Sequence, residues 1–419
     1  MARGTDMGGA GHPEPERTTT PERSSRIALV ASSAYPNPGG VEQHVRHVAR
    51  ELTARGHAVE VWTVARDGVP SRDLVDGVPV RWLPAPLPAR SAGALAGFAR
   101  RVPQAWGLWA EAVRSFRPSL LHVQCFGPNG VYAAALSRRF RIPMAVSSHG
   151  ETFMDEDDVF GQSALLRSGL RTAIARSEFV TGCSEYTLAD LRARFGLEGG
   201  HVVLNGVDPL DGPSVAASSG VDPADAAGTA PSAEPTVFAV GRLVRVKGFD
   251  LLLEAFARAS VPDGTRLVVG GDGAERTALE ASADRLGVAD RVRFLGRLDP
   301  PEVARAMASA SLLVVPSRVE AFGIVVLEGW RAGLPVIATD HGGPAEFVAH
   351  LHDGYLVDPE HPDALARALE EVLGDAGLAD RLGAAGAERV AAFTWGATVD
   401  AYERLYRERV ALPGTLTVR

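Results

Sequence analysis

Apolar residues recur every three to four positions between residues 41 and 52, at Val41, Val45, Val48 and Leu52. This spacing predicts an amphipathic helix whose apolar face covers a core. Continuous apolar runs flank the helix at 26–32 and 58–64, and a glycine-rich turn precedes it. A strand, a helix and a second strand joined in this way predict a βαβ unit and therefore a parallel sheet.

The alternation of short apolar strands and amphipathic helices continues in two series. The first series predicts further strands at 120–125, 143–150, 179–184 and 201–206. The second series predicts strands at 236–241, 265–271, 292–297, 311–317, 335–340 and 355–358. We therefore expect an α/β fold with two Rossmann-like, doubly wound parallel-sheet domains that face a central cleft. Ligands bind such sheets at the carboxyl ends of the strands.

Local composition predicts the boundaries of these domains. Residues 209–235 contain no aromatic side chain and consist mostly of Ala, Pro, Ser, Gly and Asp, which predicts a flexible linker or insertion. Residues 1–25 are rich in Pro, Gly, Thr and charge, which predicts a disordered tail. We expect an N-terminal domain over 26–208 and a C-terminal domain over 236–393. Residues 394–419 predict a helix and tail that pack back towards the first domain.

Composition and charge exclude several classes of protein. Hydrophobic residues make up 46% and charged residues 22%, which is typical of a globular chain and not of a disordered or collagen-like one. No apolar run reaches the roughly 18 residues of a transmembrane helix. The net charge of −8 lacks the basic footprint that nucleic acid requires, so we expect no nucleic-acid partner. Two cysteines without zinc-site spacing, and no secretory pattern, predict a cytoplasmic protein.

Two cations lie close together in the segment GRLVRVKGFDLL, between Gly241 at the end of a predicted strand and Gly248 at the start of a helix. Arg242 and Lys247 lie on the two sides of this turn, so both side chains can reach one point above the strand ends. Two such cations suit a diphosphate, at about 1.5–3 kcal/mol for each charge-assisted contact. Lys247 is the only lysine among 43 basic side chains, and its compact ammonium suits a phosphate oxygen. A solvated surface pair is the alternative interpretation.

Two acidic residues, Glu320 and Glu328, lie eight positions apart in the sequence. The glycine between them predicts that Glu320 lies on a loop and that Glu328 lies about a turn and a half inside the next helix. The backbone N–H groups of Gly323, Ile324 and Val325 would then be unpaired at the helix N-terminus, where they form an anion site. Glu328 can face a ribose diol and Glu320 a sugar hydroxyl. Two surface charges are the alternative interpretation.

Taken together, these motifs resemble the retaining GT-B glycosyltransferases of family 4, also described as glycosyl transferases group 1. Glu320 and Glu328 match the family's E-x7-E signature. The likeness covers residues 26–410 apart from the predicted linker. Three further family motifs match at Gly241, Arg242, Lys247 and Gly248, at Gly39, Gly40 and Glu42, and at Asn205 to Asp208.

The resemblance implies a role for each matching residue. Arg242 and Lys247 would hold the diphosphate, and Gly40 would let the opposite backbone approach it. His149 in SSHGE matches the family's cleft histidine near the donor sugar and the acceptor, whereas a lone histidine at a strand end is more often structural. The residues implied in catalysis are His149, Glu320, Arg242 and Lys247. Those implied in donor binding are Gly39, Gly40, Asn205, Gly241, Arg242, Lys247, Gly271, Arg297, Leu298, Glu320, Phe322, Gly323, Ile324, Val325 and Glu328.

The resemblance also implies an activity. A hexose-type sugar would pass from a UDP- or GDP-sugar to a hydroxyl acceptor, with retained anomeric configuration and with neither a metal nor a cofactor. The leaving phosphate gains negative charge, which Arg242, Lys247 and the helix N-terminus would stabilise. The sequence identifies neither the sugar and base of the donor nor the acceptor, so a polysaccharide, a lipid and a small molecule remain open.

Other functions are alternatives to sugar transfer for a chain with these motifs. A GT-B-type sugar-nucleotide epimerase is an alternative in another reaction class. A phosphorylase would need a pyridoxal lysine, but Lys247 lies in the diphosphate segment. A non-catalytic sugar-nucleotide-binding pseudoenzyme would be expected to lack Glu320, Lys247 or Arg242, and all three are present. A NAD-linked dehydrogenase is disfavoured because no G-x-G-x-x-G follows the first strand.

Two segments belong to none of these motifs. The four carboxylates of residues 155–158 favour a solvated loop over a metal site or a contact with a cationic acceptor. Residues 91–118 combine arginines with Phe98, Trp106 and Trp109, and Pro103 interrupts the stretch. This pattern predicts a helix pair packed on the first sheet, and the alternative is an interfacial helix in peripheral contact with the inner face of the membrane.

Overall fold

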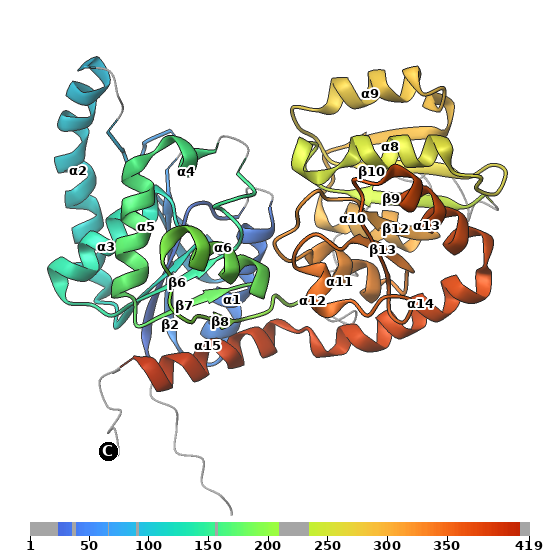
Figure 1. Ribbon diagram of the computed structural model, residues 1–419. Coiled ribbons are helices and arrows are strands. Elements are labelled where there is room, and N and C mark those ends of the chain that lie inside the picture. Colours follow the sequence, from blue (N-terminus) through green and yellow to red (C-terminus); the bar gives the residue numbers. More distant parts are fainter. Residues whose placement is uncertain are drawn as a thin grey trace, which may run out of the picture.

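The computed structural model describes residues 24–35, 39–65, 67–88, 92–155, 158–208 and 234–410 (Figure 1). The predicted tail over 1–25, the predicted linker over 209–235 and the last residues of the predicted segment 394–419 fall almost wholly outside these ranges. Two α/β halves lie side by side, each built around its own sheet. Helices from the end of the chain, drawn in red, run along one side of both halves (Figure 1).

The first sheet has eight strands in the order β3-β4-β2-β1-β5-β6-β7-β8. Neighbouring strands are parallel except β3 and β4, which form an antiparallel hairpin at one edge. Asp76 and Gly77 make its turn with φ values of +50° and +80°, as tight hairpins require. The strands span Arg26–Ala31 (β1), Ala58–Val64 (β2), Ser71–Val75 (β3), Val78–Leu83 (β4), Leu120–Gln124 (β5), Met144–Ser148 (β6), Phe179–Gly182 (β7) and His201–Val202 (β8).

The strand predicted over 201–206 is shorter than expected, because β8 ends at Val202. The chain then leaves the sheet to meet the segment before the last helix. Val207 pairs with Thr394 in an isolated parallel bridge, and its N–H donates to the Phe393 carbonyl at 2.9 Å. These backbone groups therefore find partners outside the sheet.

The second sheet has six strands, in the order β11-β10-β9-β12-β13-β14, and all its pairs are parallel. The strand order reverses between β9 and β12, which is where doubly wound sheets bind ligands. The strands span Thr236–Val240 (β9), Arg266–Gly270 (β10), Val292–Gly296 (β11), Leu312–Val315 (β12), Val336–Thr339 (β13) and Tyr355–Val357 (β14).

Helices cover both sheets. The helices of the first half span Gly40–Ala54 (α1), Ala92–Phe116 (α2), Pro128–Phe140 (α3), Val159–Gln162 (α4), Ala164–Arg176 (α5) and Glu185–Phe195 (α6). Helix α2 is continuous and contains Pro103, so the predicted helix pair over 91–118 is wrong. Later helices span Phe249–Arg258 (α8), Arg276–Arg285 (α9), Pro300–Ala308 (α10), Ile324–Arg331 (α11), Pro344–Phe347 (α12), Pro362–Gly374 (α13), Ala376–Arg389 (α14) and Trp395–Arg409 (α15), with 3-10 turns at Arg245–Lys247 (η1), Ala289–Arg291 (η2) and Val390–Ala392 (η3).

Helix α15 follows the second sheet in sequence but packs on the first one. Its apolar side chains share a buried cluster with β1 and α1, and Trp395 stacks on His47 of α1 with 4.9 Å between ring centroids. Arg55, at the end of α1, donates to Asp400 at 2.6 Å and to Glu403 at 2.8 Å. The end of the chain therefore ties the two halves together.

Candidate functional site

Lys247 and Glu320 meet at the carboxyl end of β12. Lys247 Nζ donates to Glu320 Oε2 at 2.6 Å, and Ser317 Oγ donates to the same oxygen at 3.0 Å. The exposed fraction is 20% for the lysine side chain and 8% for the glutamate side chain. Because little water reaches the pair, its charges are less screened than those of a surface ion pair. Lys247, which is predicted to bind the diphosphate, and Glu320, which is predicted to bind the sugar, are therefore in direct contact.

Two glycines let the backbone bring these side chains together. Gly248 has a φ of +67°, and a Cβ there would lie 2.0 Å from the carbonyl oxygen of Pro316. Gly342 has a φ of +113°, and a Cβ there would lie 2.1 Å from the carbonyl oxygen of Glu320. L-residues rarely adopt either conformation and would clash at both positions. A side chain at either glycine would therefore displace Lys247 or Glu320.

The N-terminus of α11 lies next to this pair and faces the N-terminus of α1. Gly323 precedes α11 with a φ of +94°. A Cβ on Gly40, the first residue of α1, would lie 3.7 Å from Ile324 Cδ1. Two helix N-termini, each the positive end of a helix dipole, therefore approach one another across the two halves. An anion between them would meet donors from both.

Glu328 lies one helical turn further along α11 and is half-buried. Burial raises the pKa of its carboxyl, and the charge of Arg331 opposes that shift. Phe322 is 2% exposed, and its ring stacks on Phe347 with centroids 4.9 Å apart. The Phe322 ring therefore belongs to the core, whereas Val325 is half-buried at the start of the helix.

The turn that follows β9 packs against the turn that follows β10. Gly271 has a φ of +124°, and a Cβ there would lie 1.8 Å from the carbonyl oxygen of Gly241. Leu298, just after β11, is half-buried beside the end of β10. Arg242 and Arg297 have exposed side chains. These five residues, all predicted to contact the donor, lie around the carboxyl ends of three neighbouring strands.

His149 follows β6, and its ring lies at the edge of a polar cluster inside the first half. Its Nε2 is 2.9 Å from Gln124 Oε1, and its backbone N–H donates to Glu151 Oε2 at 2.8 Å. The ring centroid is 4.4 Å from that of His44. Burial lowers the pKa of His149 well below its usual value, and the neighbouring His44 and His122 lower it further. The imidazole is therefore neutral at pH 7.

The loop that carries His149 touches the loop that carries Glu320. A Cβ on Gly150 would lie 2.6 Å from the Cβ of Ala321. Ser184 Oγ, at the start of α6, donates to the carbonyl oxygen of Ala321 at 2.6 Å. His149 and Glu320 are each one residue from these contacts, so the two loops bring them near one another where the two halves meet.

A second contact between the halves lies beside this one. Both carboxylate oxygens of Glu346, in α12, accept from the first N–H groups of α6, those of Glu185 at 2.7 Å and Tyr186 at 2.6 Å. A carboxylate at a helix N-terminus is stabilised by the unpaired N–H groups and the helix dipole. A groove of about 710 Å³ opens here, lined by these residues together with His341 and Arg318.

Asn205, predicted to bind the donor, lies in the interior. It is 5% exposed, and its Oδ1 is 2.7 Å from Nδ1 of His44. Its neighbour Asp208 accepts from Arg50 at 3.3 Å. In the structure the side chain of Asn205 therefore orients His44 of α1.

Acidic groups gather at two places near the cleft. Asp340, His341 and Asp358 place one ligand atom each within 4.8 Å of one another, and surface groups commonly gather in this way without an ion. Residues 156 and 157 of the predicted acidic loop lie outside the described residues. Asp155 accepts from the N–H of Val159 at 2.9 Å, and Asp158 from that of Gly161 at 3.0 Å. These two carboxylates therefore cap the start of α4.

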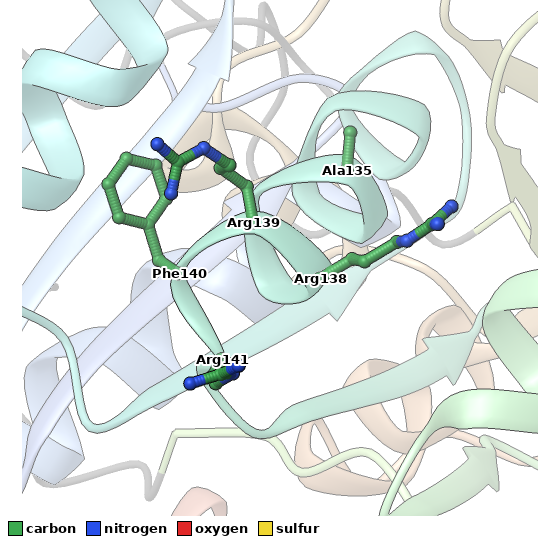
Figure 2. A pocket seen from close by; sticks show the side chains of 5 residues that line it. All are labelled: Ala135, Arg138, Arg139, Phe140 and Arg141. Carbon is green, nitrogen blue, oxygen red and sulfur yellow. The ribbon is translucent and has the colours of Figure 1, made fainter.

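A basic groove of about 610 Å³ lies at the end of α3 (Figure 2). Helix α3 runs back from the carboxyl end of β5 to the amino end of β6. Its last turn therefore lies on the side of the sheet where the strands begin, whereas His149 lies on the side where they end. The groove is lined by Ala135, Arg138, Arg139, Phe140 and Arg141. It shares no residue with the donor site.

Three residues that were not predicted hold the site together. Ser317 donates to Glu320, and Gln124 and Glu151 hold the ring and the backbone of His149. A signal for Gln124 was present, because LLHVQC places polar side chains two residues apart in an otherwise apolar strand. Polar groups on a buried strand need partners, and only the fold shows which partners they have.

Known protein families match both halves of this chain. The profile of the family described as Glycosyltransferase Family 4 matches residues 38–209, and that of Glycosyl transferases group 1 matches residues 222–389. A protein of Jonesia denitrificans named D-inositol 3-phosphate glycosyltransferase is 30% identical over 94% of this chain and 98% of its own length. The chain belongs to the GT-B glycosyltransferases of family 4, group 1. The predicted membership of family 4, group 1 is thereby confirmed, and the protein is a glycosyltransferase, whereas retention of configuration stays a prediction.

Two further relatives agree with this assignment. A Rhizobium meliloti protein named lipopolysaccharide core biosynthesis glycosyltransferase LpsE is 39% identical over 42% of this chain and 50% of its own length. Sucrose-phosphate synthase from Thermosynechococcus elongatus matches the structure with a TM-score of 0.74 and 25% identity, over 91% of this chain and 98% of that one. The predicted GT-B fold, with two doubly wound domains, is confirmed. These relatives do not favour the epimerase and pseudoenzyme alternatives.

Among the described residues, none of the helices combines the length and the apolar character needed to cross a bilayer.

Proposed function

We propose that this glycosyltransferase moves a hexose-type sugar from a UDP- or GDP-sugar to a hydroxyl acceptor, with retention of configuration and without a metal ion. The observation that carries the proposal is the contact between Lys247 and Glu320, at 2.6 Å, beside the N-terminus of α11. One cation, one anion and one helix N-terminus lie together there at the switch point of a parallel sheet. This combination suits a ligand with a diphosphate at one end and hydroxyl groups at the other.

The diphosphate would lie between the N-termini of α11 and α1. Lys247 Nζ would donate to a phosphate oxygen, and Arg242 would supply a second positive charge from the turn after β9. The first N–H groups of α11 would bind the remaining oxygens. The position of Gly40 supports this arrangement, because the start of α1 lies close to the side chain of Ile324 at the start of α11.

The sugar and ribose would be held by the two glutamates. Glu328 would accept from the ribose diol and Glu320 from the hydroxyls of the donor sugar. Because Glu320 already accepts from Lys247 and Ser317, we assign it to hydrogen bonding and not to nucleophilic attack. His149 would lie beside the sugar on the opposite side of the cleft.

Transfer would then proceed on one face of the sugar. The bond from the anomeric carbon to the phosphate oxygen breaks as the bond from that carbon to the acceptor oxygen forms. The acceptor proton passes to the leaving phosphate, which departs on the same face. Lys247, Arg242 and the helix N-terminus would stabilise the negative charge that builds on that phosphate.

The acceptor is proposed from the relatives. Proteins named D-inositol 3-phosphate glycosyltransferase match nearly the full length of this chain. D-Inositol 3-phosphate is therefore the first acceptor to test, followed by free inositol, because these two differ only in the phosphate.

Thermal unfolding with nucleoside diphosphates tests the donor site. UDP, GDP, ADP and TDP would each be added at millimolar concentration, with and without EDTA. A ligand at 100 times its dissociation constant stabilises the folded chain by about 2.7 kcal/mol. We expect one nucleotide to raise the melting temperature equally in both conditions. Lys247→Met should abolish that shift. The control Arg258→Met should keep it, because Arg258 is an exposed cation on α8 that pairs with Asp363.

Turnover of the matching sugar nucleotide tests the chemistry. The product linkage would be read by the anomeric proton coupling in NMR. Inversion of configuration would contradict the proposed same-face transfer. A lack of stabilisation by all four nucleotides would contradict the proposed donor site.

A further inference from the structure

A row of buried polar side chains crosses the middle of the first sheet beneath His149. His122 and Gln124 on β5, Ser147 on β6 and Thr181 on β7 are each no more than 1% exposed. His122 and Gln124 are two residues apart, so they point to the same face of the sheet. Gln124 pairs in register with Ser147, and Ser147 with Thr181. The row therefore runs across three neighbouring strands.

Helices α1 and α15 complete the hydrogen bonds of this row. Tyr406 OH lies 2.8 Å from His122 Nδ1, and Ser147 Oγ lies 2.8 Å from His122 Nε2. Tyr402 OH lies 3.1 Å from His44 Nε2 and 3.3 Å from Ser147 Oγ. Every ring nitrogen of His122 and His44 thus has a partner, as buried polar atoms require. Burial holds the pKa of His122 at about 3 and that of His44 at about 4, so both rings are neutral.

Gln124 connects this row to His149. Its Oε1 lies 2.9 Å from His149 Nε2, and its Nε2 lies 3.3 Å from both ring nitrogens of His122. An atom at equal distance from both nitrogens cannot approach in the ring plane, because Cε1 stands between them. The amide nitrogen therefore lies over the face of the His122 ring.

This position decides which way the amide of Gln124 faces. The face of an aromatic ring is electron-rich, so an N–H group over it is favourable and a carbonyl oxygen is not. The amide nitrogen is thus directed to His122 and the carbonyl oxygen to His149. A carbonyl oxygen can only accept, so Nε2 of His149 must carry the proton.

We propose that Gln124 is a positioning residue that holds His149 in the tautomer with the proton on Nε2 and with Nδ1 unprotonated. This inference rests on the proposed function, in which His149 lies beside the donor sugar. The neutral ring then presents Nδ1 as an acceptor for a hydroxyl of the sugar or of the acceptor substrate. A neutral ring also adds no positive charge next to a sugar that becomes positive during transfer.

Nitrogen NMR of the full chain with 15N-labelled histidine tests the tautomer. The His149 signals would be assigned by their loss in His149→Asn. We expect Nε2 to give the shift of a protonated nitrogen and Nδ1 that of an unprotonated one, unchanged from pH 6 to pH 8. A proton on Nδ1, or a charged ring at pH 7, would overturn the proposal. This readout needs no substrate, so it separates failure of this proposal from failure of the proposed transferase activity.

Variants at Gln124 test the positioning itself. Gln124→Met keeps the volume but removes the acceptor, so both tautomers of His149 should appear, and kcat should fall on the order of 100-fold with an unchanged KM for the donor. The control is Thr63→Val. Thr63 lies on a strand of the same sheet, and its hydroxyl is fully buried without a hydrogen-bond partner. This variant should change neither the nitrogen shifts nor kcat. An unchanged kcat in a folded Gln124→Met chain would refute the positioning role.

Gln124→Glu provides an independent pH readout. A carboxylate at this position would stabilise the charged imidazole and bring the pKa of His149 up towards neutrality. The other titratable groups that act on this ring are His44 from α1 and His122 from β5, while Glu151 accepts from the backbone N–H of His149, and none of them is changed. We expect kcat to fall as the pH drops through the new pKa, in parallel with protonation of His149 in NMR. A pH profile identical to that of the unsubstituted chain would contradict the inference.

Discussion

Glu320→Gln should separate catalysis from nucleotide binding. The glutamate side chain is 8% exposed and accepts from Lys247 and Ser317 through one oxygen. The amide keeps the shape but loses the charge, and with it one charge-assisted hydrogen bond of about 1.5–3 kcal/mol. Loss of one preorganised contact to the reacting sugar reduces turnover by roughly 100- to 1,000-fold.

Nucleotide binding should respond in the opposite direction. Lys247 is 20% exposed, and in the unsubstituted chain its charge is largely offset by Glu320. Without that carboxylate the ammonium is more available to a phosphate oxygen. The nucleoside diphosphate should therefore bind Glu320→Gln at least as tightly as it binds the unsubstituted chain.

Two measurements on the same preparation check this prediction. Calorimetry would give the dissociation constant of the nucleoside diphosphate, and a coupled assay would give kcat with the full sugar nucleotide. Glu360→Gln serves as a control, because Glu360 is a half-exposed acid 3.8 Å from Arg318 and makes no contact with Lys247. A turnover within threefold of the unsubstituted chain, or a nucleotide affinity that falls together with kcat, would refute the assigned role of Glu320.

Three further outcomes follow from the described contacts. Burial holds the pKa of His44 at about 4, below the value of about 6.5 in an unfolded chain. The unfolded chain then binds the proton first, so stability falls as the pH drops from 7 to 5, by roughly 2 kcal/mol for this group. Urea unfolding at both pH values should show a smaller loss for His44→Gln, and an equal loss would contradict a neutral buried ring. Gly248→Ala should lower the melting temperature more than Gly56→Ala. Both glycines have a positive φ, but only a Cβ at residue 248 would lie against a carbonyl oxygen. Equal losses would argue against a close approach of that carbonyl. Removal of divalent ions with EDTA, followed by addition of Mg²⁺, should leave kcat unchanged, and a loss restored by Mg²⁺ would contradict metal-independent transfer.

Much of the fold could be predicted because its signals are local. The apolar stripe of α1 and the short apolar runs of β1, β5, β9 and β12 each reflect burial of neighbouring residues in one element. The β3–β4 hairpin was not predicted, because its first strand is mostly exposed and shows no apolar alternation. Helix α2 was predicted to break at Pro103, but it continues through that residue.

The candidate site divides in the same way. Gly248 and Gly323 could be predicted as special positions because glycine is the residue that best adopts a positive φ at a turn. The partner of Lys247 could not, because Glu320 lies 73 residues away and meets it only when β12 brings the two loops together. Asn205 matches a family motif, yet in the structure its amide faces His44.

The sequence by itself determined the family, the two parallel-sheet halves and the residue types of a diphosphate and sugar site, because each of these depends on short segments whose spacing is visible in the chain. Only the tertiary structure decided which side chains share hydrogen bonds. The amide of Gln124 lies between His122, on its own strand, and His149, on the loop after the neighbouring strand. The polar row beneath it is completed by Tyr402 and Tyr406, from a helix near the end of the chain. Packing determines which residues so distant in sequence become partners, and no local pattern in the sequence predicts them.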